Sequence, residues 1–183
     1  MMKSNQNREK FLVVLIIIIT GLLSSCSNTS EPRDAKLTDL ATMRVSPGFE
    51  WFDSNYNSYT PDPVKIAQIN AKIQDPILKD SIMFIMFVNP SCSCTGTQQD
   101  FPETMKILNS SGIKTNQYQI YTMVSSGDNQ PYSNKFHINQ LPSLYLMIGS
   151  KVKYSILDSL TFDKILDSKK TYYIEDYILK ALN

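Results

Sequence analysis

Apolar and polar positions follow one another along the chain in patterns that predict most of its elements. The continuous apolar run 82–88 has the length of a strand buried on both faces of a sheet. Behind it, Phe101, Met105 and Leu108 mark the apolar face of a helix that stops near Gly112. A buried strand is thus followed by an amphipathic helix, with a short polar segment between them.

Capping and turn signals predict further elements. Asp62 followed by Pro63 is typical of a helix N-terminus, and we expect this helix to end near Gln74. Alternation on either side of Gly149 is typical of a β-hairpin. The other expected segments are a strand at 117–124, a short helix at 132–138, hairpin strands at 143–148 and 152–157, and one or two closing helices from 161 onward.

An aromatic-rich stretch precedes the first predicted helix. We expect it to form an N-terminal strand or loop that covers the core, rather than a ligand-stacking surface, because aromatic side chains usually serve burial. Its members are Phe49, Trp51, Phe52, Tyr56 and Tyr59. The order of all these elements predicts an α/β fold with a central mixed β-sheet flanked by helices.

The N-terminus has the pattern of an export signal. Lys3, Arg8 and Lys10 precede the apolar run 11–19, which is short for a spanning helix. The segment 23–26, Leu-Ser-Ser-Cys, resembles a bacterial lipobox. This resemblance implies a signal peptide at 1–25 and acyl chains on Cys26 that anchor the protein to a membrane. A plain transmembrane anchor is the alternative, and in both cases the rest of the chain lies outside the cytoplasm.

Composition narrows the class of protein. Residues 1–25 hold three basic residues and one acidic residue, so their removal leaves 158 residues with 15 basic and 16 acidic side chains. The charge is nearly balanced and no basic patch stands out, so we exclude nucleic acid as a partner. We expect a lipidated N-terminus and flexible tether at 26–44 and one domain at 45–183.

Cysteine chemistry is concentrated in one short motif. The chain has three cysteines, and acylation of Cys26 leaves only Cys92 and Cys94 as thiols. Both follow the predicted buried strand and precede the predicted helix. A thiol at a helix N-terminus meets unpaired backbone N–H groups and the positive end of the helix dipole, which stabilise its thiolate. Reactivity is the favoured interpretation, and two small core residues in a redox-inert fold are the alternative.

Three features of the domain occur together: the cysteine motif between a buried strand and a helix, Pro102 eight residues after Cys94, and the segment 140–143, Gln-Leu-Pro-Ser, before an apolar strand. With these features the domain resembles thioredoxin-like proteins, especially exported ones. The resemblance implies a thioredoxin-like fold, a cis peptide bond at Pro142 and backbone near it that pairs with an extended peptide. It also implies that Cys94 is the nucleophile.

The motif departs from the family's C-x-x-C pair. Counting back from Pro102 places Thr97 where the second cysteine usually stands, and Cys92 two residues upstream of Cys94. We interpret Cys92 as a resolving or ring-forming partner of Cys94, and a very small disulfide ring between them would be strained and easily reduced. An alternative register makes Cys92 the attacking thiol.

The resulting prediction is a thiol-disulfide oxidoreductase of the bacterial cell envelope, lipid-anchored and periplasmic, that needs no cofactor. Its catalytic residues would be Cys94, Cys92, Thr97 and Pro142. Its expected partners are the membrane, protein or peptide thiols and disulfides, and a redox partner protein. The alternative is a non-catalytic binding or metal-handling lipoprotein, for which His137 is the one additional ligand candidate beside the two cysteines.

Overall fold

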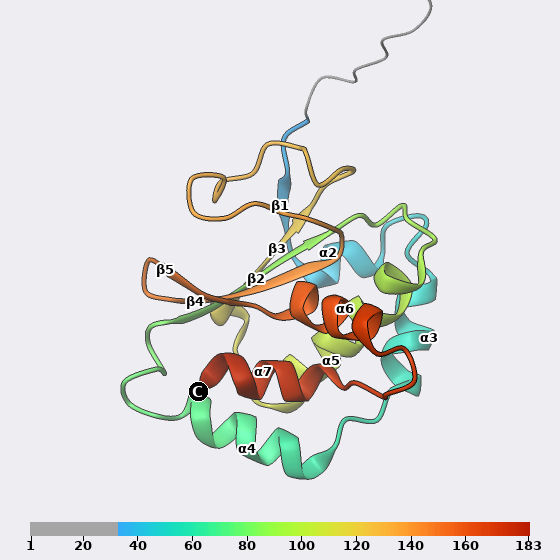
Figure 1. The fold of residues 1–183 in the computed structure, drawn as a ribbon. Coiled ribbons are helices and arrows are strands. Elements are labelled where there is room, and N and C mark those ends of the chain that lie inside the picture. The colour runs from blue at the N-terminus through green and yellow to red at the C-terminus, as the bar shows by residue number, and fades with distance from the viewer. Residues whose placement is uncertain (1–32) are drawn as a thin grey trace, which may run out of the picture. The chain divides into compact units, whose positions relative to one another are not determined.

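The structure, a computed structural model, describes residues 33–183. Within them the chain forms a mixed α/β fold around a five-stranded mixed sheet, with strand order β1-β3-β2-β4-β5 (Figure 1). Strand β2 runs parallel to β3 and antiparallel to β4, while β1 and β5 lie antiparallel to their neighbours at the two edges. The strands are β1 (Lys36–Thr38), β2 (Ile82–Val88), β3 (Tyr118–Thr122), β4 (Ser143–Ile148) and β5 (Lys151–Ser155).

The α-helices all contribute buried hydrophobic side chains to one core cluster, on one face of the sheet. Along β2, Phe84, Met86 and Val88 contribute to this cluster, as the two-residue period of a strand requires. Figure 1 shows the helices gathered on this face. They are α2 (Leu40–Arg44), α3 (Trp51–Ser58), α4 (Pro63–Ile73), α5 (Phe101–Ser110), α6 (Ile156–Leu166) and α7 (Ile174–Leu182), with short η1 (Gly96–Asp100) and η2 (Thr115–Gln117) segments.

The opposite face of the sheet is covered by the loop between β3 and β4. Ile85 and Phe87 of β2 point to this side and belong to a second cluster with Tyr121 and Tyr145. Phe136 from the loop stacks on Tyr145 with ring centroids 4.0 Å apart. Aromatic side chains of an irregular segment therefore bury this face without a helix.

Local signals produced the expected elements where they were strongest. Asp62 caps α4 through hydrogen bonds from the N–H groups of Val64 and Lys65. The hairpin between β4 and β5 turns at Gly149, whose positive φ suits glycine. The helix at 63–73, the strand at 82–88 and the hairpin are thus confirmed.

Three predicted elements were wrong in kind or extent. The aromatic stretch forms a helix, α3, instead of a strand or loop, although Phe49 and Phe52 do cover the core. Residues 132–138 form only turns, in which Phe136 N–H bonds to the Tyr132 carbonyl and no second helical turn follows. The closing helix begins at Ile156, so that β5 ends earlier than expected.

The first strand lies upstream of the predicted domain start. Strand β1 pairs Leu37 with Tyr121, and Asp34 forms a bridge with Asn129. Regular structure thus begins inside the segment that the sequence assigned to a tether. The predicted signal peptide and Cys26 lie outside the described residues.

Candidate functional site

The two cysteines follow the carboxyl end of β2, in a turn that Asn89 organises. The Asn89 side-chain oxygen accepts a hydrogen bond from Ser91 N–H at 3.0 Å, and its carbonyl accepts one from Cys92 N–H at 3.2 Å. Its amide donates to the Val124 carbonyl at 2.9 Å. Asparagine favours such turns because its short side chain replaces a backbone partner. Asn89 thereby fixes the turn to the neighbouring end of β3.

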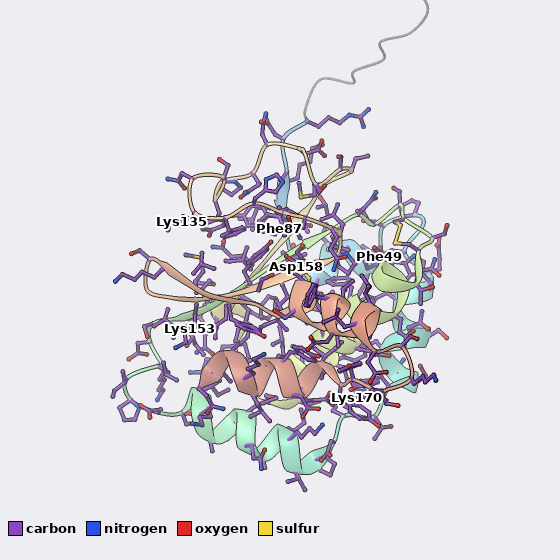
Figure 2. The ribbon with its side chains drawn as sticks, in the orientation of Figure 1. Phe49, Phe87, Lys135, Lys153, Asp158 and Lys170 are labelled. Carbon is purple, nitrogen blue, oxygen red and sulfur yellow. A yellow bond between two sulfur atoms is a disulfide. The ribbon has the colours of Figure 1, made fainter. Side chains whose placement is uncertain are left out.

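Cys92 and Cys94 form a disulfide, with their Cα atoms 5.2 Å apart. Figure 2 shows it as a yellow bond between two sulfur atoms, on the side of the molecule where Phe49 is labelled. The Cys94 N–H points to the Cys92 sulfur at 3.2 Å. Cys94 is exposed and Cys92 is half-buried, so Cys94 is the more accessible of the two.

The disulfide lies at the N-terminal end of a continuous helical segment. The Cys94 carbonyl accepts a hydrogen bond from Gln98 N–H at 3.0 Å, which makes Cys94 the residue that starts the helix. A wide turn, η1, follows at Gly96–Asp100 and leads directly into α5. The N–H groups of a first helical turn have no partner within the helix, so this helix end carries partial positive charge next to Cys94.

Thr97 is completely buried and its hydroxyl lies 3.3 Å from the Cys94 sulfur. A disulfide sulfur carries no hydrogen, so the hydroxyl is the donor in this contact. A buried hydroxyl loses free energy when it has no partner. The sulfur of Cys94 therefore satisfies Thr97, and the same hydroxyl is positioned to donate to a Cys94 thiolate.

Pro142 approaches the cysteine loop through Gly96. The Leu141–Pro142 peptide bond is cis, and Pro142 is buried immediately before β4. A Cβ atom added to Gly96 would lie 3.3 Å from Pro142 Cδ, closer than most side chains pack. The structure thus brings Cys92, Cys94 and Thr97 together and places Pro142 next to them through Gly96, a contact that sequence reasoning missed.

A carboxyl group next to this contact was also missed. The Asp100 carboxylate lies near Gly96, at 3.8 Å from the same added Cβ, and 3.4 Å from Lys164 Nζ of α6. Burial raises the pKa of Asp100 above its ordinary value, and the charge of Lys164 only partly opposes this effect. No sequence signal identified the pair, because 64 residues separate its members.

His137, the third ligand candidate, lies outside the cysteine site. His137 is exposed, and its backbone carbonyl accepts a hydrogen bond from the Tyr145 hydroxyl at 2.9 Å. Among residues 33–183, no three His, Cys, Asp or Glu side chains lie close enough together to hold a metal ion. The structure therefore does not combine His137 with Cys92 and Cys94 as a ligand set.

Every helix in the described part of the chain is too short or too polar to cross a membrane. Comparison with protein-family models, with curated proteins and with solved structures finds no match. The function is therefore inferred from the residues of this chain.

Proposed function

We propose that the chain is a thiol-disulfide oxidoreductase with a thioredoxin-like fold. One observation carries the proposal: Cys94, which is exposed and bonded to Cys92, stands at the start of a helix, and the buried Pro142 lies beside that start. The passage from a buried strand through cysteines to a helix, with Pro102 inside it, supports the same resemblance. A disulfide between residues two apart closes hardly any chain, so cross-linking the fold is not its main use.

The proposed reaction is thiol-disulfide exchange at Cys94. A substrate thiolate attacks the Cys94 sulfur, the Cys92–Cys94 bond breaks, and its electron pair leaves on Cys92 as a thiolate. A second substrate thiolate then attacks the substrate sulfur of the mixed disulfide and releases Cys94. The substrate is oxidised to a disulfide, and the protein is reduced to a dithiol by the same two electrons. In the reverse direction, the reduced Cys94 thiolate attacks a disulfide of a protein or peptide, and one sulfur of that disulfide leaves as a thiolate. Cys92 then attacks the Cys94 sulfur, displaces the second thiolate and reforms the Cys92–Cys94 bond.

The two cysteines have different roles in this proposal. Cys94 is the more exposed residue, and its sulfur contacts the Thr97 hydroxyl, which can stabilise a thiolate. Cys92 is half-buried, and in the disulfide its sulfur accepts the Cys94 N–H. We therefore assign attack to Cys94 and resolution to Cys92.

We also propose that this domain is held in the bacterial cell envelope, outside the cytoplasm, by acyl chains on Cys26. The support is the sequence of residues 1–26. Cys26→Ala should leave an uncleaved precursor without an acyl adduct, while its disulfide still forms. Intact mass and membrane fractionation test this proposal, and a wild-type protein without an acyl adduct contradicts it.

The test of function compares Cys92→Ser and Cys94→Ser in the full-length chain, with Ser93→Ala as a matched change in the same loop. Cys92→Ser should accumulate mixed disulfides with partner proteins. Cys94→Ser should form none and should lose peptide-disulfide reduction, and Ser93→Ala should behave as wild type. Non-reducing gels and mass spectrometry of the peptide that contains both cysteines provide the measurement. Equal, slow alkylation of both cysteines, with no adducts from either mutant, would favour a non-catalytic binding module.

A further inference from the structure

Helix α6 is attached to the candidate site by three polar contacts on one of its faces. Asp158 Oδ2 accepts from the Asn139 amide at 3.3 Å, and Thr161 Oγ1 accepts from the Gln140 amide at 2.7 Å. The third contact is the ion pair of Lys164 with Asp100. Positions three apart share a helix face, so this face is turned toward the loop before Pro142 and the start of α5.

Next to this face, α6 exposes large apolar side chains. Phe162 is 60% exposed, Ile165 75% and Leu166 68%. Phe162 and Ile165 line a hollow of about 590 Å³ together with Gln140, Thr161 and Tyr154. Figure 2 labels Asp158, which also lines this hollow, at α6. Exposed apolar side chains around a concavity mark a binding surface more often than isolated ones do.

The backbone beside the hollow has unused hydrogen-bonding groups. Among the described residues, the N–H groups of Asn139, Gln140 and Leu141 have no backbone or side-chain partner. An extended polypeptide can satisfy such groups with its own backbone, and its side chains then enter neighbouring pockets. Lipid hydrocarbon offers no such partners, which favours a peptide over a membrane surface here.

We propose that this hollow selects substrates. It takes a large aliphatic or aromatic side chain near the reacting cysteine of an extended polypeptide, and Phe162 and Ile165 are its specificity-determining residues. This inference depends on the proposed function, because the peptide is held while its sulfur exchanges with Cys94. The hollow adjoins Gln140, two residues before Pro142, so a bound chain passes from the hollow toward the disulfide.

The test uses reduced, full-length Cys92→Ser in detergent and single-cysteine peptides activated as mixed disulfides with thionitrobenzoate. Two peptides differ only in leucine or serine near the cysteine. Cys94 displaces thionitrobenzoate, which leaves as a coloured thiolate. The leucine peptide should react faster by about fivefold, the order expected for partial burial of one aliphatic side chain. Phe162→Ser and Ile165→Ser should abolish the preference, while Ile77→Ser should keep it, because Ile77 is equally apolar and 82% exposed but precedes β2.

A small disulfide, hydroxyethyl disulfide, separates the two proposals. One outcome is that all variants react equally with this probe while the leucine preference is absent, or survives Phe162→Ser and Ile165→Ser. That result overturns the role of the hollow in substrate selection and leaves the exchange function intact. No reaction of Cys94 with the probe overturns the function, and the hollow as a substrate site with it. Loss of the leucine preference after reconstitution into phosphatidylglycerol vesicles would show that lipid covers this face, which also overturns the peptide assignment.

Discussion

Gly96 and Pro142 come from different parts of the chain and meet at the candidate site, where a Cβ on Gly96 would lie 3.3 Å from Pro142 Cδ. Because Gly96 has no side chain, the ring of Pro142 can lie against the first helical turn after Cys94. Both residues are constrained, because a proline ring cannot rotate away and Gly96 is held within the η1 turn. Their contact sets the spacing between the disulfide and the loop before β4.

Gly96→Ala should therefore push the Pro142 loop away from Cys94. We expect exchange between Cys94 and a peptide disulfide to slow, and the free energy of unfolding to fall by about 1 kcal/mol, since overpacking outweighs the helix propensity of alanine. Gly127→Ala is the control, because its added Cβ meets nothing closer than 3.7 Å. Stopped-flow exchange and urea denaturation measure the two effects, and an unchanged exchange rate in Gly96→Ala would contradict the role given to this contact.

Thr97→Val tests the hydroxyl next to the Cys94 sulfur. Valine keeps the shape of the buried side chain but cannot donate to a thiolate, so the pKa of the Cys94 thiol should rise. Alkylation of reduced Cys94 should slow by about tenfold at a fixed pH below that pKa. Thr95→Val, at an exposed position one residue after Cys94, is the matched control. The pH dependence of iodoacetamide labelling decides, and identical profiles for both variants would exclude a role of Thr97 in stabilising the thiolate.

The buried carboxylate of Glu175 in α7 allows a separate prediction about stability. Glu175 is 1% exposed, and its Oε1 accepts a hydrogen bond from the Tyr59 hydroxyl at 2.7 Å. Tyr59→Phe removes this donor and should lower the free energy of unfolding by about 2 kcal/mol. Tyr56→Phe removes an exposed hydrogen bond with Asn109 and should cost far less. Urea denaturation compares the two, and equal losses would show that burial of Glu175 does not govern the effect.

The raised pKa of Asp100 predicts how stability depends on pH. Burial disfavours the charged carboxylate, so the folded state holds its proton to higher pH than the unfolded state does. The stability of the wild type relative to Asp100→Asn should therefore fall as the pH rises through the ordinary value of 3.8 and beyond it.

Asp128 provides a control of opposite sign. Burial acts to raise its pKa, but hydrogen bonds from the N–H groups of Ser125, Val124 and Arg33 lower it overall. The stability of the wild type relative to Asp128→Asn should be complete above the ordinary carboxyl value and should be lost as the pH falls below it. Urea denaturation across this range measures both differences, and slopes of the same sign would contradict the assignment for Asp100.

The sequence predicted those parts of the fold that depend on neighbouring residues. Asp62 and Pro63 start α4, and Gly149 turns the hairpin, because each signal acts within a few residues. The helix at Trp51–Ser58 was missed, since its aromatic residues favour strands locally, whereas in the fold Phe52 of this helix packs on Phe101 of α5. The conformation of this segment therefore follows its tertiary packing and not its local preference.

The residues of the candidate site also fall into two groups: those with a local sequence signal and those that only the fold brings together. The cysteine motif and the prolines identify Cys92, Cys94, Thr97 and Pro142 because each lies at a recognisable position in the chain. The contact of Asp100 with Lys164 could not be predicted, since it depends on where α6 crosses the start of α5. The attachment of Gln140 to Thr161 has the same origin. Long-range contacts of this kind carry no local pattern.

The free edge of β5 has a consequence for the protein at high concentration. Lys151 and Lys153 are exposed and alternate along this outermost strand, whose outer backbone groups face no other strand of the described residues. The formal net charge of the whole chain is only +1, so general repulsion between copies is weak. Two ammonium groups at the edge oppose strand addition by a second copy, because pairing would strip their water and bring like charges together. Crowded molecules of this chain are thereby protected from joining edge to edge into larger sheets.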